Sequence, residues 1–464
     1  MRRAFVLAFL VAAGCLGQGS APVPTPKPFV FVDPISGDAS HIHADPTQHN
    51  LVLNTTLLGH HFLTEQEGEA PGSHSIDLCD HWVVLGRQES GQTGVDIVDV
   101  ADEANPVWVG KYRDSNAQPG DRDVAWSADC GYIFNANGGS MPQNSGVLVI
   151  NAKDKSNPVF ESRFQIPGTF LPPNPASSGV TPGVHTIYAL SVFGIQYVYA
   201  LNWGVHILRA APGADGKLAL SYAGRYAAAD AESLERANAG NPDATATRRT
   251  VYGHDLSVYL ETGRVMMYVA YAYDGLRIVD ITDPTQPVER GHWRPDDTPG
   301  APHYVHSVKT YHRSDGRRIT VLGAETFEDR TADVPSPLWT LDTTDPARIQ
   351  LLDTWVNPGH HGSQLLFMSL HFYEVENETL WLTHYHGGVW VLDLHDPADI
   401  TVKGYYMPHE DNAFRPPAPA PGGFKQDGIP MSYDLKLRDG IAYVADDYTG
   451  LYLLRLENAA SNAP

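Results

Sequence analysis

Positive charge, helical periodicity, cysteine and long apolar runs are all scarce in this 464-residue chain. Lysine and arginine total 32 against 54 acidic residues, and the formal net charge of −22 argues against a nucleic-acid phosphate backbone as partner. After the N-terminus no apolar stretch reaches about 18 residues, so the sequence predicts no later membrane span. The abundance of Tyr, Trp, Gly and Pro instead predicts many short strands joined by tight turns.

The first 15 residues form a targeting segment. Arg2 and Arg3 precede the apolar run AFVLAFLVAAG, which is too short to span a bilayer and suits a secretory signal. The run ends at Cys15 and resembles a bacterial lipobox, with Ala12 where Leu is usual. We expect lipidation of Cys15, a Pro-rich tether over residues 16–47, and an exported lipoprotein of the outer membrane, periplasm or cell surface. A cleaved signal peptide without lipid is the alternative.

A two-strand pattern recurs along the chain. In GLRIVDITDPTQPVERGHW, residues 275–293, an apolar alternation enters a Thr-Asp-Pro turn and a second strand follows. Six further copies, the last without its second strand, begin at Gly94, Gly146, Gly204, Leu338, Gly388 and Gly450. Two more strands separate successive copies, so each unit has four strands, A to D. Self-similarity at roughly 50–70 residues, with no helix in each repeat, predicts a propeller.

The seventh unit stops after strand C, and the segment Asn50–Phe62 supplies the missing strand D. Its Gly59-His60-His61 matches Gly291-His292-Trp293 of another unit. We therefore predict an all-β fold, a single seven-bladed β-propeller of four-stranded blades over residues 48–457. The N-terminal strand closes the ring, which removes open sheet edges. Residues 458–464 form a tail.

The strand-C motif stands as Leu276-Arg277-Ile278-Val279-Asp280, with related copies at 95–99 and 389–393. These copies resemble the LVIVD-repeat family of bacterial and archaeal surface proteins. The resemblance implies a propeller on an exported, often anchored, protein, and it implies no settled activity. The third unit departs from the pattern, because it has Ile207-Leu208-Arg209 and no Asp-Pro turn, and so does the seventh.

Long connections are expected on one face only. The A–B and C–D turns share one face of a propeller, and the B–C and D–A loops share the other. All the long insertions belong to the second group: 165–183, 227–250, 326–337 and 407–430. Because long connections in a compact fold are usually functional or disordered, we predict that this loop-rich face binds an unknown protein, glycan or small molecule.

Two cysteines fall on the opposite face. Cys79 and Cys130 lie in the A–B turns of the first two blades. Adjacent blades could bring them within disulfide reach, and an exported compartment permits oxidation. Two unpaired thiols are the alternative.

Histidines recur where strand A begins, at the mouth of the central channel on the loop-rich face. Imidazole is the commonest protein ligand for zinc and also binds copper and iron. We predict one divalent transition metal (zinc, copper, iron or manganese) on a set of five ligand candidates: His185, His254, His306, His371 and His74. Other polar residues are predicted nearby, as outer partners or further ligands: Asp123, Asp255, His384, His386, Tyr433 and Asp434.

These histidines also have a structural interpretation, because a repeated residue in a repeated fold often hydrogen-bonds within its own blade. The chain has no Gly-x-Ser-x-Gly elbow, P-loop, Cys-x-x-Cys or His-Glu-x-x-His motif to assign a reaction. Two functions therefore stay open. The first is a surface binding or scaffold propeller, and the second is a metal-dependent oxidoreductase or hydrolase at the channel mouth.

Overall fold

The structure is a computed structural model, and it describes residues 52–63, 72–87, 94–114, 123–138, 145–167, 183–202, 204–228, 253–261, 263–295, 303–326, 336–358, 369–408 and 430–457. The expected signal segment with Cys15, the tether 16–47, most of the long insertions and the tail 458–464 lie outside these ranges. Within them every regular element is a strand, and no helix has the length and apolar character to cross a membrane.

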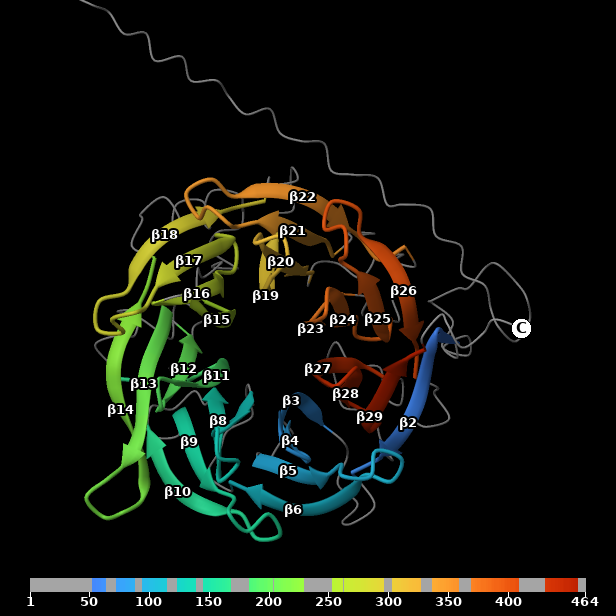
Figure 1. The fold of residues 1–464 in the computed structure, drawn as a ribbon. Helices are drawn as coiled ribbons and strands as arrows, with labels where there is room; N and C mark the ends of the chain where they lie inside the picture. The colour runs from blue at the N-terminus through green and yellow to red at the C-terminus, as the bar shows by residue number, and fades with distance from the viewer. Residues whose placement is uncertain are drawn as a thin grey trace, which may run out of the picture.

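The strands form seven antiparallel sheets arranged as blades around a central axis, which confirms the predicted seven-bladed propeller (Figure 1). Blade 1 contains β3 (Ser73–Cys79), β4 (Trp82–Arg87), β5 (Gly94–Asp99) and β6 (Val107–Arg113). Blade 2 contains β7 (Val124–Trp126), β8 (Tyr132–Gly138), β9 (Ser145–Asn151) and β10 (Val159–Phe164). Blade 3 contains β11 (Thr186–Val192), β12 (Ile195–Asn202), β13 (Gly204–Pro212) and β14 (Leu218–Tyr226). Blade 4 contains β15 (Asp255–Glu261), β16 (Arg264–Ala270), β17 (Leu276–Asp280) and β18 (Val288–Trp293).

The last three blades follow the same order, with the first strand nearest the axis. Blade 5 contains β19 (Tyr304–His312), β20 (Arg318–Glu325), β21 (Leu338–Asp342) and β22 (Gln350–Trp355). Blade 6 contains β23 (Tyr373–Glu376), β24 (Thr379–Thr383), β25 (Val389–Asp393) and β26 (Thr401–Tyr406). Blade 7 contains β27 (Ser432–Arg438), β28 (Ile441–Asp446), β29 (Gly450–Leu456) and the N-terminal β2 (Thr55–His61).

The N-terminal segment closes the ring, but it does so as two strands rather than the single strand expected from the sequence. Asn54 adopts a positive φ of 50°, which breaks the segment after β1 (Val52–Leu53). The short β1 pairs with β26 as a fifth strand of blade 6, whereas β2 pairs with β29 in blade 7. The segment therefore joins two blades to each other as well as completing one, and it covers both outer edges at the seam.

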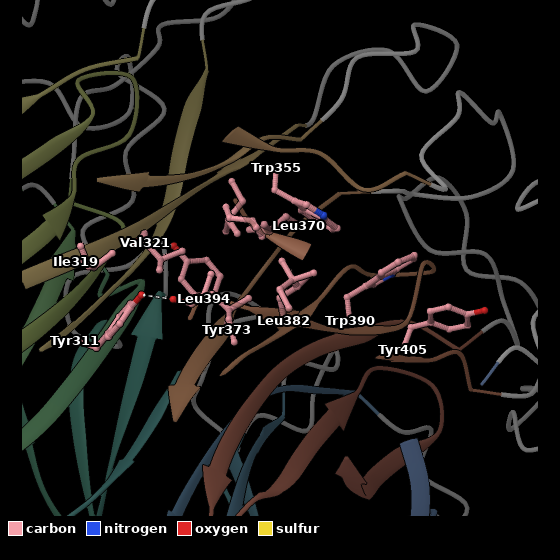
Figure 2. Packing of buried hydrophobic residues seen from close by; sticks show 14 of the residues in the cluster. Tyr311, Ile319, Val321, Trp355, Leu370, Tyr373, Leu382, Trp390, Leu394 and Tyr405 are labelled. Atoms are coloured by element: carbon pink, nitrogen blue, oxygen red, sulfur yellow. Dashed lines mark hydrogen bonds between the residues drawn. The ribbon is translucent and has the colours of Figure 1, made fainter. Parts of the chain in front are cut away.

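The hydrophobic core is divided among the junctions between blades. A separate cluster of buried apolar side chains lies between each pair of adjacent blades. Figure 2 shows the cluster between blades 5 and 6, where Trp390 packs near Trp355 and Tyr405. Strand C lies inside this packing, so β17 is buried at every position, while the outer β18 is exposed at most positions. This burial on both faces explains the continuous apolar character of the strand-C motif.

The recurrent glycine of strand D marks a close contact with the next blade. A Cβ at Gly291 would lie 1.8 Å from the backbone oxygen of Pro346, and one at Gly59 would lie 2.1 Å from that of Glu103. The C–D turn of the following blade therefore packs directly on this backbone, and a side chain would force the blades apart. The same packing accounts for the register shift immediately before each of these glycines.

Cys79 and Cys130 form a disulfide that links the A–B turns of blades 1 and 2, with 5.6 Å between the two Cα atoms. The Lys155 ammonium of blade 2 donates a hydrogen bond to the backbone oxygen of Cys130 at 2.7 Å, and it lies 5.6 Å from the ring centroid of Trp82 in blade 1. The covalent link and this cation contact hold together the two blades that follow the closing strand.

Deleting residues 1–62 should destabilise the propeller relative to a matched variant that lacks only residues 1–48. The longer deletion removes β1 and β2, and it takes Leu58 out of the cluster between blades 7 and 1 and Leu53 off the cluster between blades 5 and 6. Loss of these two apolar side chains alone should cost about 3 kcal/mol, and the exposed edge of β29 should promote self-association. Thermal melting and size-exclusion chromatography measure both effects. Equal melting temperatures and a monomer in both variants would show that the closure contributes nothing.

Candidate functional site

The residues at the channel mouth project from irregular positions at the start of strand A. In blade 5 the pairing of β19 with β20 skips His306, which lies between Val305 and Ser307. Blades 1 and 7 skip His74 and Tyr433 in the same way. A residue in a β-bulge is left out of the ladder, and its side chain is redirected. Sheet irregularity thus turns these side chains toward the mouth.

Four of the predicted ligands lie in direct contact along one arc. The ring centroids of His185 and His254 are 4.3 Å apart, and those of His254 and His306 are 3.8 Å apart. His306 and His371 follow at 4.4 Å. Beyond them the ring of Tyr433 lies 4.3 Å from His371. Consecutive blades 3 to 6 therefore each bring one imidazole to the same place.

A carboxylate joins the arc from the neighbouring strand. Glu325, the last residue of β20, is 3% exposed, and its Oε2 lies 3.2 Å from Nε2 of His306. One ligand atom from each of His306, Glu325 and His371 lies within 4.8 Å of the other two, and all three residues are buried. Tyr385 donates a hydrogen bond from its hydroxyl to the other oxygen of Glu325. Two imidazoles and one carboxylate thus converge at bonding range for a single cation.

Hydrogen bonds determine which nitrogen of His371 faces this group. Its Nδ1 lies 2.6 Å from the backbone oxygen of Tyr433, and because a carbonyl only accepts, Nδ1 carries the proton. Neutral His371 therefore has a lone pair on Nε2. That atom has no hydrogen-bond partner among the described residues. An imidazole oriented by a carbonyl on one nitrogen is the usual arrangement of a metal ligand.

His306 is oriented in the same way through a hydroxyl. Ser307 donates its only hydroxyl proton to the backbone oxygen of His371 at 2.6 Å, so its oxygen accepts from Nδ1 of His306, also at 2.6 Å. The lone pair of Nε2 then faces the Glu325 carboxylate. Two electron-rich atoms at 3.2 Å repel each other unless one of the two groups carries a proton between them or a cation binds there.

His185 and His254 form a pair beside this group. Nδ1 of His254 donates to the backbone oxygen of His306 at 3.1 Å, which leaves Nε2 of His254 as an acceptor. Nε2 of His185 lies 2.6 Å from it and must donate. These two imidazoles are hydrogen-bonded to each other, so the geometry narrows the candidate ligand set to His306, His371 and Glu325.

Burial favours the neutral form of three of these imidazoles: His254, His306 and His371. Loss of solvation, with repulsion from neighbouring histidines, lowers the pKa values of His254 and His306 well below their usual range. Burial also lowers the pKa of His371 to about 3, against the opposing effect of its hydrogen bond to Tyr433. Burial and then the charge of Glu325 raise the pKa of Tyr385. Neutral imidazoles are the form that binds metal ions.

The remaining predicted residues divide between the mouth and the channel. Nε2 of His74 lies 3.1 Å from Asp447, and its ring contacts Tyr433 with 4.5 Å between centroids. His384 and His386 are buried in the B–C connection of blade 6. The three aspartates are not with the histidines, because each points along the channel and accepts backbone N–H groups of strand A: Asp123, Asp255 and Asp434.

Glu325 and Tyr385 were not predicted from the sequence. Glu325 ends a strand immediately before a long insertion, in GAETFE, and an acidic residue at that position is a weak signal. Strand pairing supplies the missing information, because Glu325 lies opposite Tyr304, close to His306 in the adjacent strand. Tyr385 lies between His384 and His386 in the sequence, and a tyrosine at that position carries no recognisable signal of a functional site.

Comparison with known proteins agrees with this architecture. Residues 266–294, which cover β17, β18 and most of β16, match the family model of the LVIVD repeat. This chain is a β-propeller with an LVIVD repeat. No curated protein matches it.

Three solved structures are similar to this LVIVD-repeat propeller at low identity. A protein of Bacteroides uniformis, provisionally named a 6-phosphogluconolactonase, is 9% identical with a TM-score of 0.49, over 78% of this chain and 88% of that one. The computationally designed protein Ika8 is 10% identical with a TM-score of 0.44, over 86% and 99%. The β-propeller domain of Cps50 (Swd1) from Myceliophteria thermophila is 11% identical with a TM-score of 0.46, over 87% and 98%.

The depressed pKa of His371 should make the LVIVD-repeat propeller less stable in acid. The unfolded chain binds a proton at this residue below about pH 6.5, whereas the folded protein resists it down to about pH 3. The contribution of neutral His371 to the unfolding free energy is therefore complete above pH 6.5, and it is lost as the pH falls toward 3. In chelator-treated protein, His371→Asn should flatten the fall in unfolding free energy by about 1.4 kcal/mol per pH unit between pH 6 and 4.

Asparagine can still donate to the Tyr433 oxygen, so the hydrogen bond itself is retained in this variant. The exposed His395, changed to Asn, provides the control for replacing a histidine outside the channel mouth. Urea denaturation at several pH values measures both. If the unfolding free energies of the wild type and His371→Asn fall in parallel as the pH is lowered, His371 is not held neutral in the folded protein.

Proposed function

We propose that this LVIVD-repeat propeller is an exported binding protein whose centre is one divalent transition metal ion at the channel mouth. The observation that carries the proposal is the orientation of His306 and His371, each with Nδ1 used in a hydrogen bond and Nε2 directed at the group that includes Glu325. Two histidines and one carboxylate suit zinc, ferrous iron or manganese. A cation there would also remove the repulsion between His306 and Glu325.

The binding surface in this proposal is the loop-rich face around the metal. Strands β20 and β24, which end at Glu325 and Thr383, lead toward the B–C connections, and the candidate ligands lie at those ends. Loops that surround a rigid ring are a common way to build a recognition surface for a protein, a glycan or a small molecule. A lipid on Cys15 would hold this surface at a membrane, and the Pro-rich tether would keep it at a distance from the bilayer.

A second candidate function is a metal-dependent oxidoreductase or hydrolase. It is favoured by the small size of the ligand set, because three protein ligands leave coordination positions for water, oxygen or substrate. When bound, the metal would supply Lewis acidity or redox chemistry. The chain itself would contribute the hydroxyl of Tyr385, held against Glu325, and the neutral His185–His254 pair, which can pass a proton between Nε2 atoms.

The protein purified without a histidine tag should contain, or bind on addition, one equivalent of zinc, iron, manganese or copper. Glu325→Gln keeps the shape of the side chain and removes its charge, so it should weaken metal binding at least about a hundredfold while leaving the β-sheet spectrum unchanged. Glu103→Gln, a matched change in a partly exposed C–D turn, should bind metal as the wild type does. Elemental analysis and calorimetric titration measure the binding.

Metal should also raise the melting temperature of the wild type and not that of Glu325→Gln, since a ligand that binds only the folded state stabilises it by about 2.7 kcal/mol at a hundred times its Kd. If the untagged wild type contains no stoichiometric metal and binds none of the four ions, the metal proposal fails. The surface-binding function would then remain without a metal centre.

Export and anchoring are tested separately. Replacing Cys15 by Ser should move the protein from the membrane fraction to the soluble fraction of the cell envelope, because the lipid can no longer be attached. Fractionation and metabolic labelling with a fatty acid measure the change. An unaltered partition, with no label on the wild type, would leave only a cleaved signal peptide.

A further inference from the structure

The central channel contains a second feature, separate from the histidine arc. A cavity of about 330 Å³ lies on the axis, and strand A of every blade, or the residue preceding it, contributes to its wall. Its volume is within the range of small-molecule sites, about 300–1,000 Å³. Its wall carries six carboxyl groups and two ammonium groups: Asp77, Asp123, Asp255, Asp434, Glu374, Glu376, Lys309 and Lys436.

One carboxylate is already neutralised. Oε1 of Glu374 lies 3.1 Å from Nζ of Lys309 and 3.2 Å from Nζ of Lys436. Burial alone would raise the pKa of Glu374, but the two ammonium groups lower it below its usual range. The three side chains retain between 13% and 26% exposure, so solvent reaches the cavity. This triad forms a cationic patch on blades 5 to 7.

The four aspartates face the cavity with no ammonium partner within salt-bridge distance among the described residues. Each accepts backbone N–H groups, as when Asp77 accepts from Trp126 at 2.7 Å and Asp255 from Val308 at 2.9 Å. A carboxylate oxygen has two lone pairs, so each retains accepting capacity toward the cavity. Burial, and for Asp123 the nearby Asp434, raises their pKa values, to about 7 for Asp123 and about 6 for Asp434. Part of the wall is therefore protonated near neutral pH, and its negative charge grows as the pH rises through these pKa values.

Two hydroxyls on the inner strands β11 and β15 also make no hydrogen bond within the described part of the chain. Tyr188 lines the cavity, and its hydroxyl makes no hydrogen bond within the described part of the chain. Ser257 is 4% exposed and has an unpartnered hydroxyl. It follows Asp255 by two residues on β15, so both side chains project from the same face of the strand. The Tyr188 hydroxyl is therefore available to an occupant of the cavity, whereas Ser257 is not among the residues that line it.

We propose that this cavity binds a small organic cation with primary ammonium groups, held by the aspartates and by the hydroxyl of Tyr188. Carboxylates on blades 1, 2, 4 and 7 line one cavity, and Asp123 and Asp434 are close enough to interact electrostatically, which favours a ligand with two ammonium groups. A metal ion fits less well, because the only group of three metal-binding side chains within 4.8 Å in the described residues is at the mouth. The site is independent of the metal centre.

Calorimetric titration with 1,4-diaminobutane tests the proposal on chelator-treated, full-length protein. The diamine should bind with one-to-one stoichiometry, and the neutral 1,4-butanediol should not. Binding should be tighter at pH 8 than at pH 6, because Asp123 and Asp434 are ionised at the higher pH. Binding of Ca²⁺ or Mg²⁺ without binding of the diamine would overturn the proposal, and so would the absence of any binding.

Two variants with opposite effects separate recognition from structural damage. Asp77→Asn keeps an acceptor for Trp126 and should weaken diamine binding about tenfold, whereas Lys309→Met removes a positive charge and should tighten it about tenfold. Asp439→Asn is the matched control, since this exposed residue has a φ of 53°, which asparagine adopts readily. Loss of binding in both cavity variants, or no change in either, would contradict electrostatic recognition in the cavity. Glu325→Gln should bind the diamine normally, so failure of the metal proposal would leave this result unaffected.

Discussion

The structure depends on hydrogen bonds that join the innermost strand of each blade to the innermost strand of the next. At four junctions a buried aspartate accepts a backbone N–H of the following blade: Asp434 to blade 1, Asp77 to blade 2, Asp123 to blade 3 and Asp255 to blade 5. At the other three a side chain donates to a backbone oxygen: Thr186 to His254, Ser307 to His371 and His371 to Tyr433. Apolar packing between blades is not directional, so it leaves the relative height of adjacent blades weakly fixed. These hydrogen bonds fix the relative height of the blades. Loss of one of them would leave a buried polar group unpaired, which costs about 1–3 kcal/mol of stability.

The same hydrogen bonds remove the apparent choice between a structural and a metal-binding role for the histidines. His371 uses Nδ1 to join blade 6 to blade 7, and this leaves Nε2 as the only basic atom of the ring. Ser307 joins blade 5 to blade 6 and at the same time fixes Nδ1 of His306 as a donor. An imidazole has two nitrogens, so one can hold the blades together while the other faces the mouth. Repetition of histidine at this position is therefore what both roles require.

The sequence was sufficient for the fold because the blade pattern is local and repeated. The apolar strand C, the Asp-Pro turn and the strand-D glycine each recur in the sequence from blade to blade. Ring closure was predicted because one strand D was missing from the last unit. The split at Asn54 was not predicted: asparagine adopts the left-handed conformation more readily than most residues, but most asparagines do not adopt it, so the residue type alone does not mark a break. The histidines were found for the same reason as the blades. Glu325 was missed because it occurs once, and its proximity to His306 depends on pairing between β19 and β20. The sequence also placed Asp123 at the mouth by alignment, whereas the structure directs its carboxylate to the next blade and the cavity.

The two levels of the channel differ in how they hold charge. At the mouth the histidines are neutral, and a single carboxylate, Glu325, is the only acidic member of the group within 4.8 Å. Phe372 packs against His371 and also lines the cavity, so the cavity begins directly next to the histidines, and Glu374 follows on β23. There the charges are numerous but separated, and two lysines neutralise only part of them. Converging nitrogen lone pairs favour an ion that forms coordinate bonds, whereas carboxylates spread around a wider cavity favour a cation that donates hydrogen bonds. The repeat places similar strands at every blade, and substitutions at two levels of those strands create two environments with different ligand chemistry.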